Sequence, residues 1–195
     1  LALAPENPRA HVRMAALIAV SGGSEEGADW HYRRAIQLAP EDATVLTMYA
    51  TRLLHAKKID AAIALWEKAV RVEPYSRIHR QALALLYMKR GRLDAAQNQL
   101  ETLLALHPGL ERQLARDAAL LRLLQGRARE VLQSIERIED PVDRLAIRAK
   151  ALHALGRVGE SRAVLATLGE QRGSHALLRR CEVMAYLEDA CTSAQ

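Results

Sequence analysis

Apolar residues recur along this chain at helical spacing and are interrupted at regular intervals by proline. Pro5, Pro40, Pro74, Pro108 and Pro141 follow one another at intervals of 35, 34, 34 and 33 residues. The positions two and four residues before each of the first four prolines are apolar, and alanine or a larger apolar residue recurs five, eight and twelve residues before the second, third and fourth. This spacing predicts an apolar stripe along a helix of roughly four turns.

A second set of signals predicts another helix upstream of each of these. Ala50 and Ala84 lie near the middle of that preceding helix, where small residues allow two antiparallel helices to approach closely. Gly22 and Gly23, Lys57 and Lys58, and Gly91 mark the links, where a left-handed residue can end the first helix. Proline then closes the second helix, because it lacks a donor and disfavours helix in the residue before it. No strand-like alternation interrupts the pattern, so the predicted fold class is all-α.

A period near 34 residues is typical of helical repeats that bury their apolar faces by stacking on one another. The segment 60–74, DAAIALWEKAVRVEP, resembles the second helix of the tetratricopeptide repeat family, and the region from about Ala10 to Pro108 resembles three consecutive repeats of it. The resemblance implies a right-handed superhelical solenoid of antiparallel helix pairs. It also implies a concave face, lined by the first helix of each pair, that receives an extended or helical peptide.

Four segments are expected from this reading: 1–8 as the tail of a preceding repeat, 9–108 as three well-formed repeats, 109–172 as two degenerate helical repeats, and 173–195 as a C-terminal capping helix and tail. Within the degenerate part, the pattern predicts helices at 120–126, at 131–138 with Pro141 as its end, at 149–157 and at 161–168, followed by a last helix at 175–190. The truncated first repeat and the missing initiator Met favour a fragment of a longer protein; the alternative is a short N-terminal cap.

Charge and hydropathy exclude several classes of function. The chain has 28 basic and 23 acidic side chains, a formal charge of +5. Both signs are interspersed, as in 127–130 and 136–140, which is typical of solvated helix faces. No regular set of base-reading residues recurs in the repeats, which disfavours nucleic-acid binding. No apolar run approaches the roughly 20 residues needed to span a bilayer, and no secretory signal is present. A soluble segment without membrane insertion is predicted.

Cysteine and histidine provide no pattern for a metal site or a catalytic site. Cys181 and Cys191 lie ten residues apart in one predicted helix and are interpreted as a buried small residue and a terminal thiol. This usage favours a reducing cytoplasm slightly over the periplasm. None of the seven histidines has another three or four residues away, so no helix presents two imidazoles on one face. His55 and His79 are candidates to face the groove. With no catalytic motif, we expect no enzyme activity, no cofactor and no metal.

Projecting the first helices by the repeat spacing predicts the lining of the groove. The candidate peptide-binding residues are Val12, Ala16, Thr47, Met48, Thr51, Leu54, His55, Gln81, Leu85, Met88 and Lys89, and the projection also places Arg9, Arg13, Ala19, Val20, Thr44, Ile78 and Ala82 on this face. One branch of the family holds a peptide's terminal carboxylate with Lys, Asn and Arg; here Val12, Ala16 and Met48 replace them, which disfavours that ligand. An apolar groove with Met and Thr suits an amphipathic helix instead. The alternative occupant is the protein's own helix at 175–190.

Two functions remain open at this stage. The first is a non-catalytic scaffold that binds a protein or peptide segment, as part of a larger bacterial export or assembly protein. The excess of Arg, 23 against five Lys, is typical of GC-rich bacterial genomes. The second is a regulatory or dimerisation arm of a transcription regulator or enzyme that lies outside the fragment, with a homodimer as one form.

Overall fold

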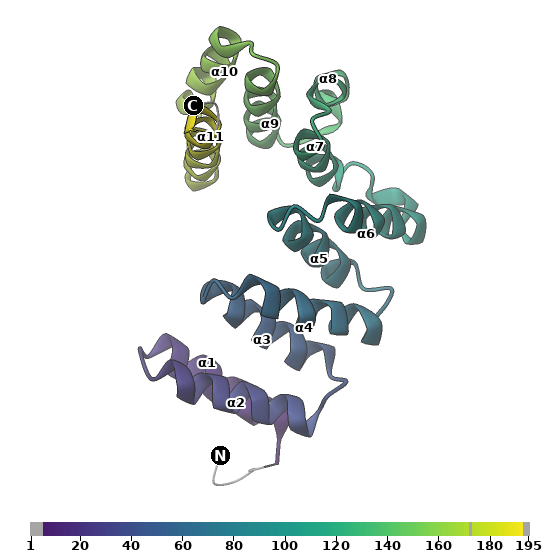
Figure 1. The fold of residues 1–195 in the computed structure, drawn as a ribbon, viewed down its shortest axis with the longest axis vertical. Coiled ribbons are helices and arrows are strands. Elements are labelled where there is room, and N and C mark those ends of the chain that lie inside the picture. The colour runs from purple at the N-terminus through teal and green to yellow at the C-terminus, as the bar shows by residue number, and fades with distance from the viewer. Residues whose placement is uncertain (1–5, 172, 193–195) are drawn as a thin grey trace. The chain divides into compact units, whose positions relative to one another are not determined.

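A computed structural model describes residues 6–171 and 173–192, with side chains as far as Met184 (Figure 1). The described residues form helices joined by short links, with no strand among them. The helices are α1 Pro8–Val20, α2 Glu25–Leu38, α3 Ala43–His55, α4 Ile59–Val72, α5 Arg77–Lys89, α6 Leu93–Leu106, α7 Ala115–Leu124, α8 Ala128–Gln133, α9 Pro141–Ala154, α10 Val158–Glu170 and α11 Ser174–Thr192, with single 3-10 turns η1 Pro108–Leu110 and η2 Ile135–Arg137. The first five residues of the tail expected at 1–8 and the side chain of Cys191 lie outside the described residues.

The all-α prediction and the pairing of adjacent helices are confirmed. α1 packs on α2, α3 on α4, and α9 on α10. The chain divides into two compact units between Tyr87 and Met88, within α5. Unit 1 holds the first two helix pairs and α5 as far as Tyr87, and unit 2 holds the end of α5 and α6 to α11.

The core of unit 1 is the apolar stripe that the sequence predicts. Ala28, Tyr32 and Ala35 of α2 are buried, as are Ala62, Ile63, Trp66 and Ala69 of α4. The facing helices contribute Ala15 and Ala50, both with 0% exposure. Alanine at these positions lets the backbones of a pair approach, and the larger Tyr and Trp fill the space between pairs.

Left-handed residues end the first helices of the pairs. Gly22, Gly91, Gly126 and Gly156 have φ between 69° and 76°, a region that glycine adopts without strain. Lys57 has a φ of 58° at the equivalent link, where a side chain carries a conformational cost. The four glycines and Lys57 therefore reverse the chain in the same way.

Unit 2 departs from the predicted boundaries around α7 and α8. The helix expected at 120–126 spans Ala115–Leu124, and the one expected at 131–138 breaks after six residues and resumes as η2. At the break, the Ser134 hydroxyl donates to the carbonyl oxygens of Glu130 (2.8 Å) and Val131 (3.4 Å). Such local bonds compete with continuation of the helix.

Pro141 was expected to close a helix, but it opens α9. Asp140 is the N-cap of α9, and its carboxylate accepts a 2.7 Å hydrogen bond from the backbone N–H of Asp143. Proline at the first helical position loses no hydrogen bond, since that N–H has no partner within the helix. α9 thus begins well before the predicted 149–157.

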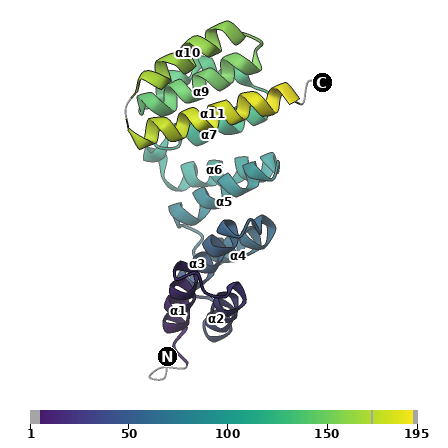
Figure 2. The same ribbon diagram turned by 90° about the vertical axis from the view of Figure 1, so that its left-hand side faces the viewer.

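The last helix, α11, packs against α9 and α10 (Figure 2). Its described buried residues are Ala176 and Val183, and Val183 joins Ala146, Ala149 and Leu168 in one apolar cluster. Cys181 is exposed, so its interpretation as a buried residue was wrong. It lies two residues from Val183, on another face of the helix.

Candidate functional site

A hollow of about 320 Å³ opens in unit 1, and we refer to it as the α1–α3 hollow. Its lining comes from both helix pairs of this unit: Ala16, Ala19 and Val20 of α1, Tyr32 of α2, Thr47, Met48, Thr51, Arg52 and His55 of α3, and Trp66 of α4. Small side chains on α1 leave this space open, because alanine at two positions extends little beyond the backbone. The buried rings of Tyr32 and Trp66, 4% and 7% exposed, form part of its wall.

The structure brings together several residues of the predicted lining. Ala16, Thr47, Met48, Thr51 and His55 all face this hollow, with Ala19 and Val20 beside them. Three further residues were not predicted as lining: Tyr32 and Trp66 belong to the buried stripe of the second helices, and Arg52 lies next to Thr51. Only the packing of one helix pair on the next brings these side chains to the site.

The remaining predicted residues do not line the α1–α3 hollow. Val12 and Met88 are 3% and 7% exposed; their burial leaves no surface for a peptide, so we remove them from the proposed lining. Leu54, Gln81, Leu85 and Lys89 are not among the residues that line it. His79, another candidate, is buried, with its ring 5.7 Å from Trp66 and its Nδ1 3.4 Å from Glu73.

The hydroxyl groups of the hollow already have acceptors. Thr47 Oγ1 donates to the carbonyl oxygen of Thr44 (3.2 Å), and Thr51 Oγ1 donates to that of Thr47 (2.8 Å). Both bonds stay within α3. The hydroxyl protons are therefore used inside the helix, and the lining acts mainly as an apolar surface.

Arg52 and Trp66 supply polar atoms of a different kind. Arg52 Nη2 donates to Glu25 Oε1 at 3.0 Å, and this bond lowers the pKa of the Glu25 carboxyl. Arg52 Nε and Trp66 Nε1 are both buried, and neither has an acceptor in the described part of the chain. Buried donors are normally hydrogen-bonded, so this pair is unusual.

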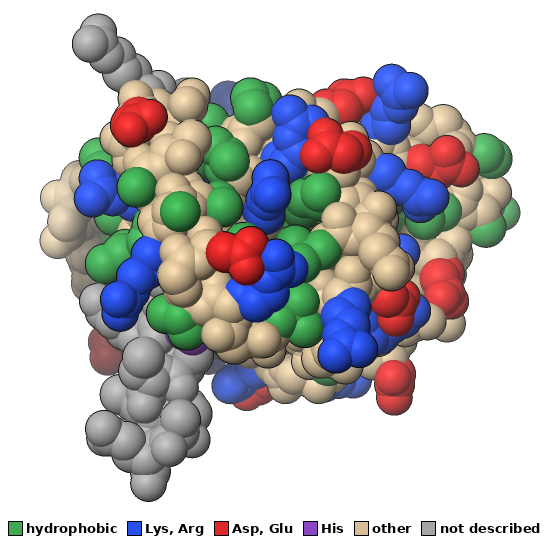
Figure 3. Space-filling view, turned by 90° about the horizontal axis from the view of Figure 1, so that it is seen from above, with side chains coloured by type: hydrophobic (Ala, Val, Ile, Leu, Met, Phe, Trp, Pro, Cys, Tyr) green, Lys and Arg blue, Asp and Glu red, His purple; other side chains and the backbone are tan. Residues whose placement is uncertain are grey.

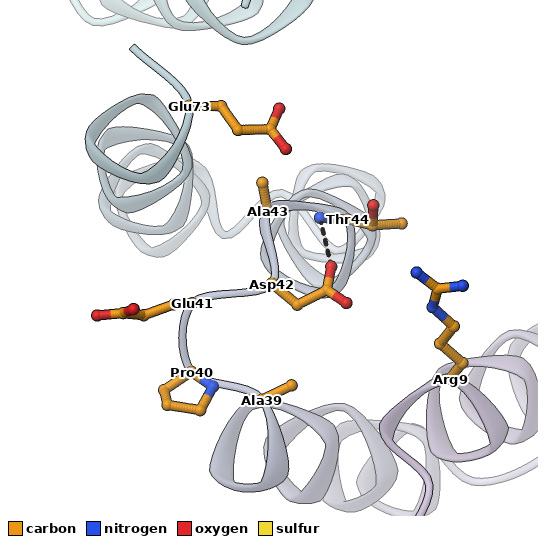
Figure 4. Close-up of a pocket in the computed structure, with 8 residues that line it drawn as sticks. All are labelled: Arg9, Ala39, Pro40, Glu41, Asp42, Ala43, Thr44 and Glu73. Atoms are coloured by element: carbon orange, nitrogen blue, oxygen red, sulfur yellow. Dashed lines mark hydrogen bonds between the residues drawn. The ribbon is translucent and has the colours of Figure 1, made fainter.

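A second hollow, of about 570 Å³, lies beside the link between α2 and α3 (Figure 4). Arg9 and Glu73 reach toward this link from α1 and from the end of α4 (Figure 4). The Asp42 carboxylate caps α3, accepting from the N–H of Thr44 (2.9 Å) and Val45 (3.2 Å). Because Asp42 is engaged in capping and the other charges have opposite signs, we place the candidate site in the α1–α3 hollow.

Two histidines meet across the first helix pair. His11 of α1 and His31 of α2 have their Nδ1 atoms 2.9 Å apart, and the indole of Trp30 lies edge-on to His31 at 4.8 Å between ring centroids. Burial, followed by the neighbouring His11, lowers the pKa of His31. The two histidines lie 20 residues apart on different helices, so spacing within one helix does not reveal this pair. The sequence signal for a ring cluster at this place is that Trp30 directly precedes His31.

Unit 2 contains a cluster of charges centred on Asp143 of α9. Asp143 Oδ1 accepts from Arg116 Nε of α7 at 3.2 Å and from Arg179 Nε of α11 at 2.5 Å. Arg179 also donates to both carboxylate oxygens of Glu182 at 2.8 Å. Lys150 lies in the same surroundings, and burial lowers its pKa. These contacts connect three helices of unit 2.

The oxygens of Asp140 and Asp143 and a nitrogen of His175 lie within 4.8 Å of one another, which raises the question of a metal site. Asp143 Oδ1 is already shared by two guanidinium groups, and Asp140 Oδ1 caps α9. Two neighbouring cations oppose a third positive charge. This trio is better explained as part of the ion-pair cluster.

The surface shows no segregation of charge on the face drawn in Figure 3, where Lys and Arg side chains alternate with Asp and Glu. Two i,i+3 ion pairs also join side chains of opposite charge: Arg127 with Glu130, and Arg157 with Glu160. In the part of the chain that the structure describes, no helix combines the length and the apolar character needed to cross a membrane.

No model of a known protein family matches the sequence, and no curated protein sequence matches it. Solved structures do. PilW, a widely conserved type IV pilus biogenesis factor, matches with a TM-score of 0.67 and 18% identity over 89% of this chain and 83% of its own. MamA matches with a TM-score of 0.65 and 15% identity over 92% of this chain and 94% of its own. PilF of Pseudomonas aeruginosa matches with a TM-score of 0.58 and 15% identity over 96% of this chain and 87% of its own. These likenesses show that the chain has a tetratricopeptide-like helical repeat fold.

Proposed function

We propose that this protein is a non-catalytic scaffold that binds an amphipathic helix of a protein partner in the α1–α3 hollow. The observation that carries the proposal is the hollow itself: Ala16, Ala19, Val20 and Met48 give it an apolar lining on two neighbouring first helices. An apolar groove of this kind binds a helix through residues at helical spacing. Met48, a flexible and polarizable side chain, can adjust to the shape of the guest.

The chemistry of the lining favours binding over catalysis. His55 is the one histidine among the residues that line the hollow, and no carboxylate lies beside it in that lining. The hydroxyls of Thr47 and Thr51 are hydrogen-bonded to backbone carbonyls of their own helix, so neither is paired with a base. A catalytic site normally requires such a nucleophile–base pair or an equivalent acid–base pair.

We propose that this scaffold is part of a larger bacterial protein that acts in assembly or export. PilW is named as a pilus biogenesis factor, and its likeness to this chain in fold supports that setting. The second candidate is a regulatory or dimerisation arm. It is favoured by the exposed apolar side chains of α11, with Leu177 63% and Leu178 55% exposed, which offer a surface for another chain.

The proposal is tested by filling the hollow. Thr51→Trp places an indole in the lining, whereas Ala64→Trp adds the same side chain on an exposed position of α4 and serves as the matched control. Crosslinking and affinity capture from bacterial lysate should recover a protein with the wild type and with Ala64→Trp but not with Thr51→Trp. Recovery of the same proteins by all three would show that binding does not use the hollow.

A further inference from the structure

We propose that the partner's helix is acidic, and that one of its side-chain carboxylates binds Arg52 in the α1–α3 hollow. This inference names the chemistry of the partner and rests on the proposed function. It follows from three observations. Charge is distributed unevenly among the helices of unit 1, Arg52 has an acceptor at Nη2 but none at Nε, and the indole N–H of Trp66 has no acceptor among the described residues.

Acidic side chains are absent from both first helices that line the hollow. The sequences of α1 and α3 contain no Asp or Glu, but they contain Arg9, Arg13 and Arg52. The second helices α2 and α4 carry the acids instead, namely Glu25, Glu26, Asp29, Asp60 and Glu67. None of the residues that line the hollow is a carboxylate. The guanidinium of Arg52 in this lining is balanced only by Glu25 of α2, whose side chain is 68% exposed, so an acidic guest is complementary once it displaces Glu25.

The guanidinium of Arg52 has one free hydrogen-bonding position on its side-on edge. Elsewhere in this protein that edge binds both oxygens of a carboxylate: Arg127 donates to Glu130 through Nε (2.7 Å) and Nη2 (2.6 Å), and so does Arg157 to Glu160 at the same two distances. Arg52 uses Nη2 alone, on Glu25 at 3.0 Å, while its Nε is buried without an acceptor. A guest carboxylate that replaces Glu25 at Nη2 would occupy both positions once the side chains that cover Nε shift locally.

Trp66 provides the second unpaired donor in the same hollow. Its side chain is 7% exposed and lines the hollow, and its Nε1 is buried without an acceptor within the described residues. Leaving such a donor unpaired is unfavourable. A guest acceptor can pair such a donor only where docking uncovers it, and Arg52, whose side chain is 16% exposed, is more accessible than Trp66, which is 7% exposed.

Glu25 is the intramolecular competitor for Arg52. The Glu25 side chain is 68% exposed, so water can solvate its carboxylate once a guest replaces it at Nη2. Exchange of one carboxylate for another preserves the charge balance around Arg52. Removal of Glu25 should therefore strengthen binding of an acidic guest, whereas a merely structural Glu25–Arg52 pair would give no such gain.

The test begins with a phage-displayed library of synthetic amphipathic helices, in which an apolar stripe is fixed and the polar positions are randomised. We expect the selected helices to carry Asp or Glu at one preferred position beside the stripe. Affinities are then measured by fluorescence anisotropy for one selected peptide and for the same peptide with Gln at that position. Wild-type protein should bind the Gln peptide about tenfold more weakly, since a charge-assisted bidentate contact is lost.

Protein variants distinguish a specific contact with Arg52 from nonspecific charge attraction. Arg52→Lys keeps the charge but loses the planar fork, and should weaken binding of the acidic peptide about tenfold. Glu25→Gln should strengthen it several-fold, whereas Glu26→Gln, the same charge change at an exposed neighbouring position, should not. Circular dichroism reports whether each variant is folded. If Arg52→Lys does not fold, the Glu25→Gln variant and the Gln peptide still decide the question.

The outcomes distinguish this inference from the proposed function. Selected helices that lack acids, bind Arg52→Lys as well as the wild type and are lost on Thr51→Trp would overturn the acidic partner and keep the hollow as a binding site. A library that yields no helix sensitive to Thr51→Trp would overturn both. Equal effects of Glu25→Gln and Glu26→Gln would reduce the preference to general charge attraction and also overturn the specific role of Arg52.

Discussion

His11 Nδ1 lies 2.9 Å from His31 Nδ1, across the packed faces of α1 and α2. At that distance one nitrogen donates a proton and the other accepts it, so the contact is lost when both Nδ1 atoms carry protons. His11 is 3% exposed, so the contact lies inside the first helix pair. It joins two side chains that lie 20 residues apart, and the pKa of one of them, His31, is lowered by burial.

The stability of the protein should fall as the medium is acidified. The folded-state pKa of His31 lies below its ordinary value, so on acidification the unfolded chain takes up a proton before the folded chain does. The contribution is complete above about pH 6.5 and decreases as the pH falls from there toward the folded pKa. We expect a loss below about 1 kcal/mol, because water screens this partly exposed group.

Urea unfolding at pH 7.5 and at pH 5.5 measures this effect. His31→Gln should flatten the difference between the two pH values, while His55→Gln, a histidine of the hollow, should retain it. An unchanged pH dependence in His31→Gln would show that the pair does not control acid stability.

Ala62→Arg should destabilise unit 1 by several kcal/mol. Ala62 is 0% exposed on the face of α4 that packs inside unit 1, so a larger side chain displaces its neighbours and a charge is buried; overpacking alone costs about 1–3 kcal/mol. Ala64→Arg makes the same change on the exposed face of α4 and should alter stability by less than about 0.5 kcal/mol. Thermal melts that shift equally for the two variants would contradict this helix orientation.

Much of the fold could be predicted because the repeat is a local pattern. The alanines and aromatic residues counted back from Pro40 and Pro74 are all buried, joined on α4 by Ile63, since the spacing of apolar residues along a helix determines which face is buried. The boundaries of α8 could not be predicted in the same way. The Ser134 hydroxyl donates there to the carbonyl oxygen of Glu130. A side-chain hydrogen bond of this kind leaves no trace in the spacing of apolar residues.

The candidate site was predictable in part. Five of the eleven proposed residues face the α1–α3 hollow, but Val12 lies between the buried His11 and Ala15 at the edge of the stripe, where a projection cannot separate core from surface. Arg52 and the Asp143 cluster were missed for a different reason. Interspersed charges were interpreted as solvated faces, and only the packing of neighbouring helices shows which of them are half-buried and share partners.

Ser161→Ala should cost about 1 kcal/mol, the usual value of a single buried hydrogen bond. Ser161 lies on α10 and is 0% exposed. Its hydroxyl donates to the carbonyl oxygen of Ala149 on α9 at 2.8 Å. It joins two helices, whereas the Thr167 hydroxyl, on the same helix, bonds to the carbonyl of Ala163 and is exposed. Thr167→Val is therefore the control and should be nearly neutral in chemical denaturation. A neutral Ser161→Ala would show that the interhelical bond contributes nothing net.

Asp143→Asn should loosen α11 selectively. The substitution removes the negative charge shared by Arg116 and Arg179 and leaves two partly buried guanidinium groups close together with one anion fewer, at a cost of about 3 kcal/mol. α11 has few other described attachments, because Ala176 and Val183 are its buried side chains. Hydrogen exchange should therefore accelerate in α11 more than in α10.

The exposed pair Arg112 and Glu139, 3.3 Å apart with side chains 79% and 62% exposed, provides the comparison for this substitution. Glu139→Gln should leave exchange in α11 unchanged, since pairs of this exposure contribute less than about 1 kcal/mol. High salt should not rescue Asp143→Asn to wild-type protection, because screening acts weakly on partly buried charges. Equal exchange in α11 for the two variants would mean that apolar contacts alone hold this helix on α9.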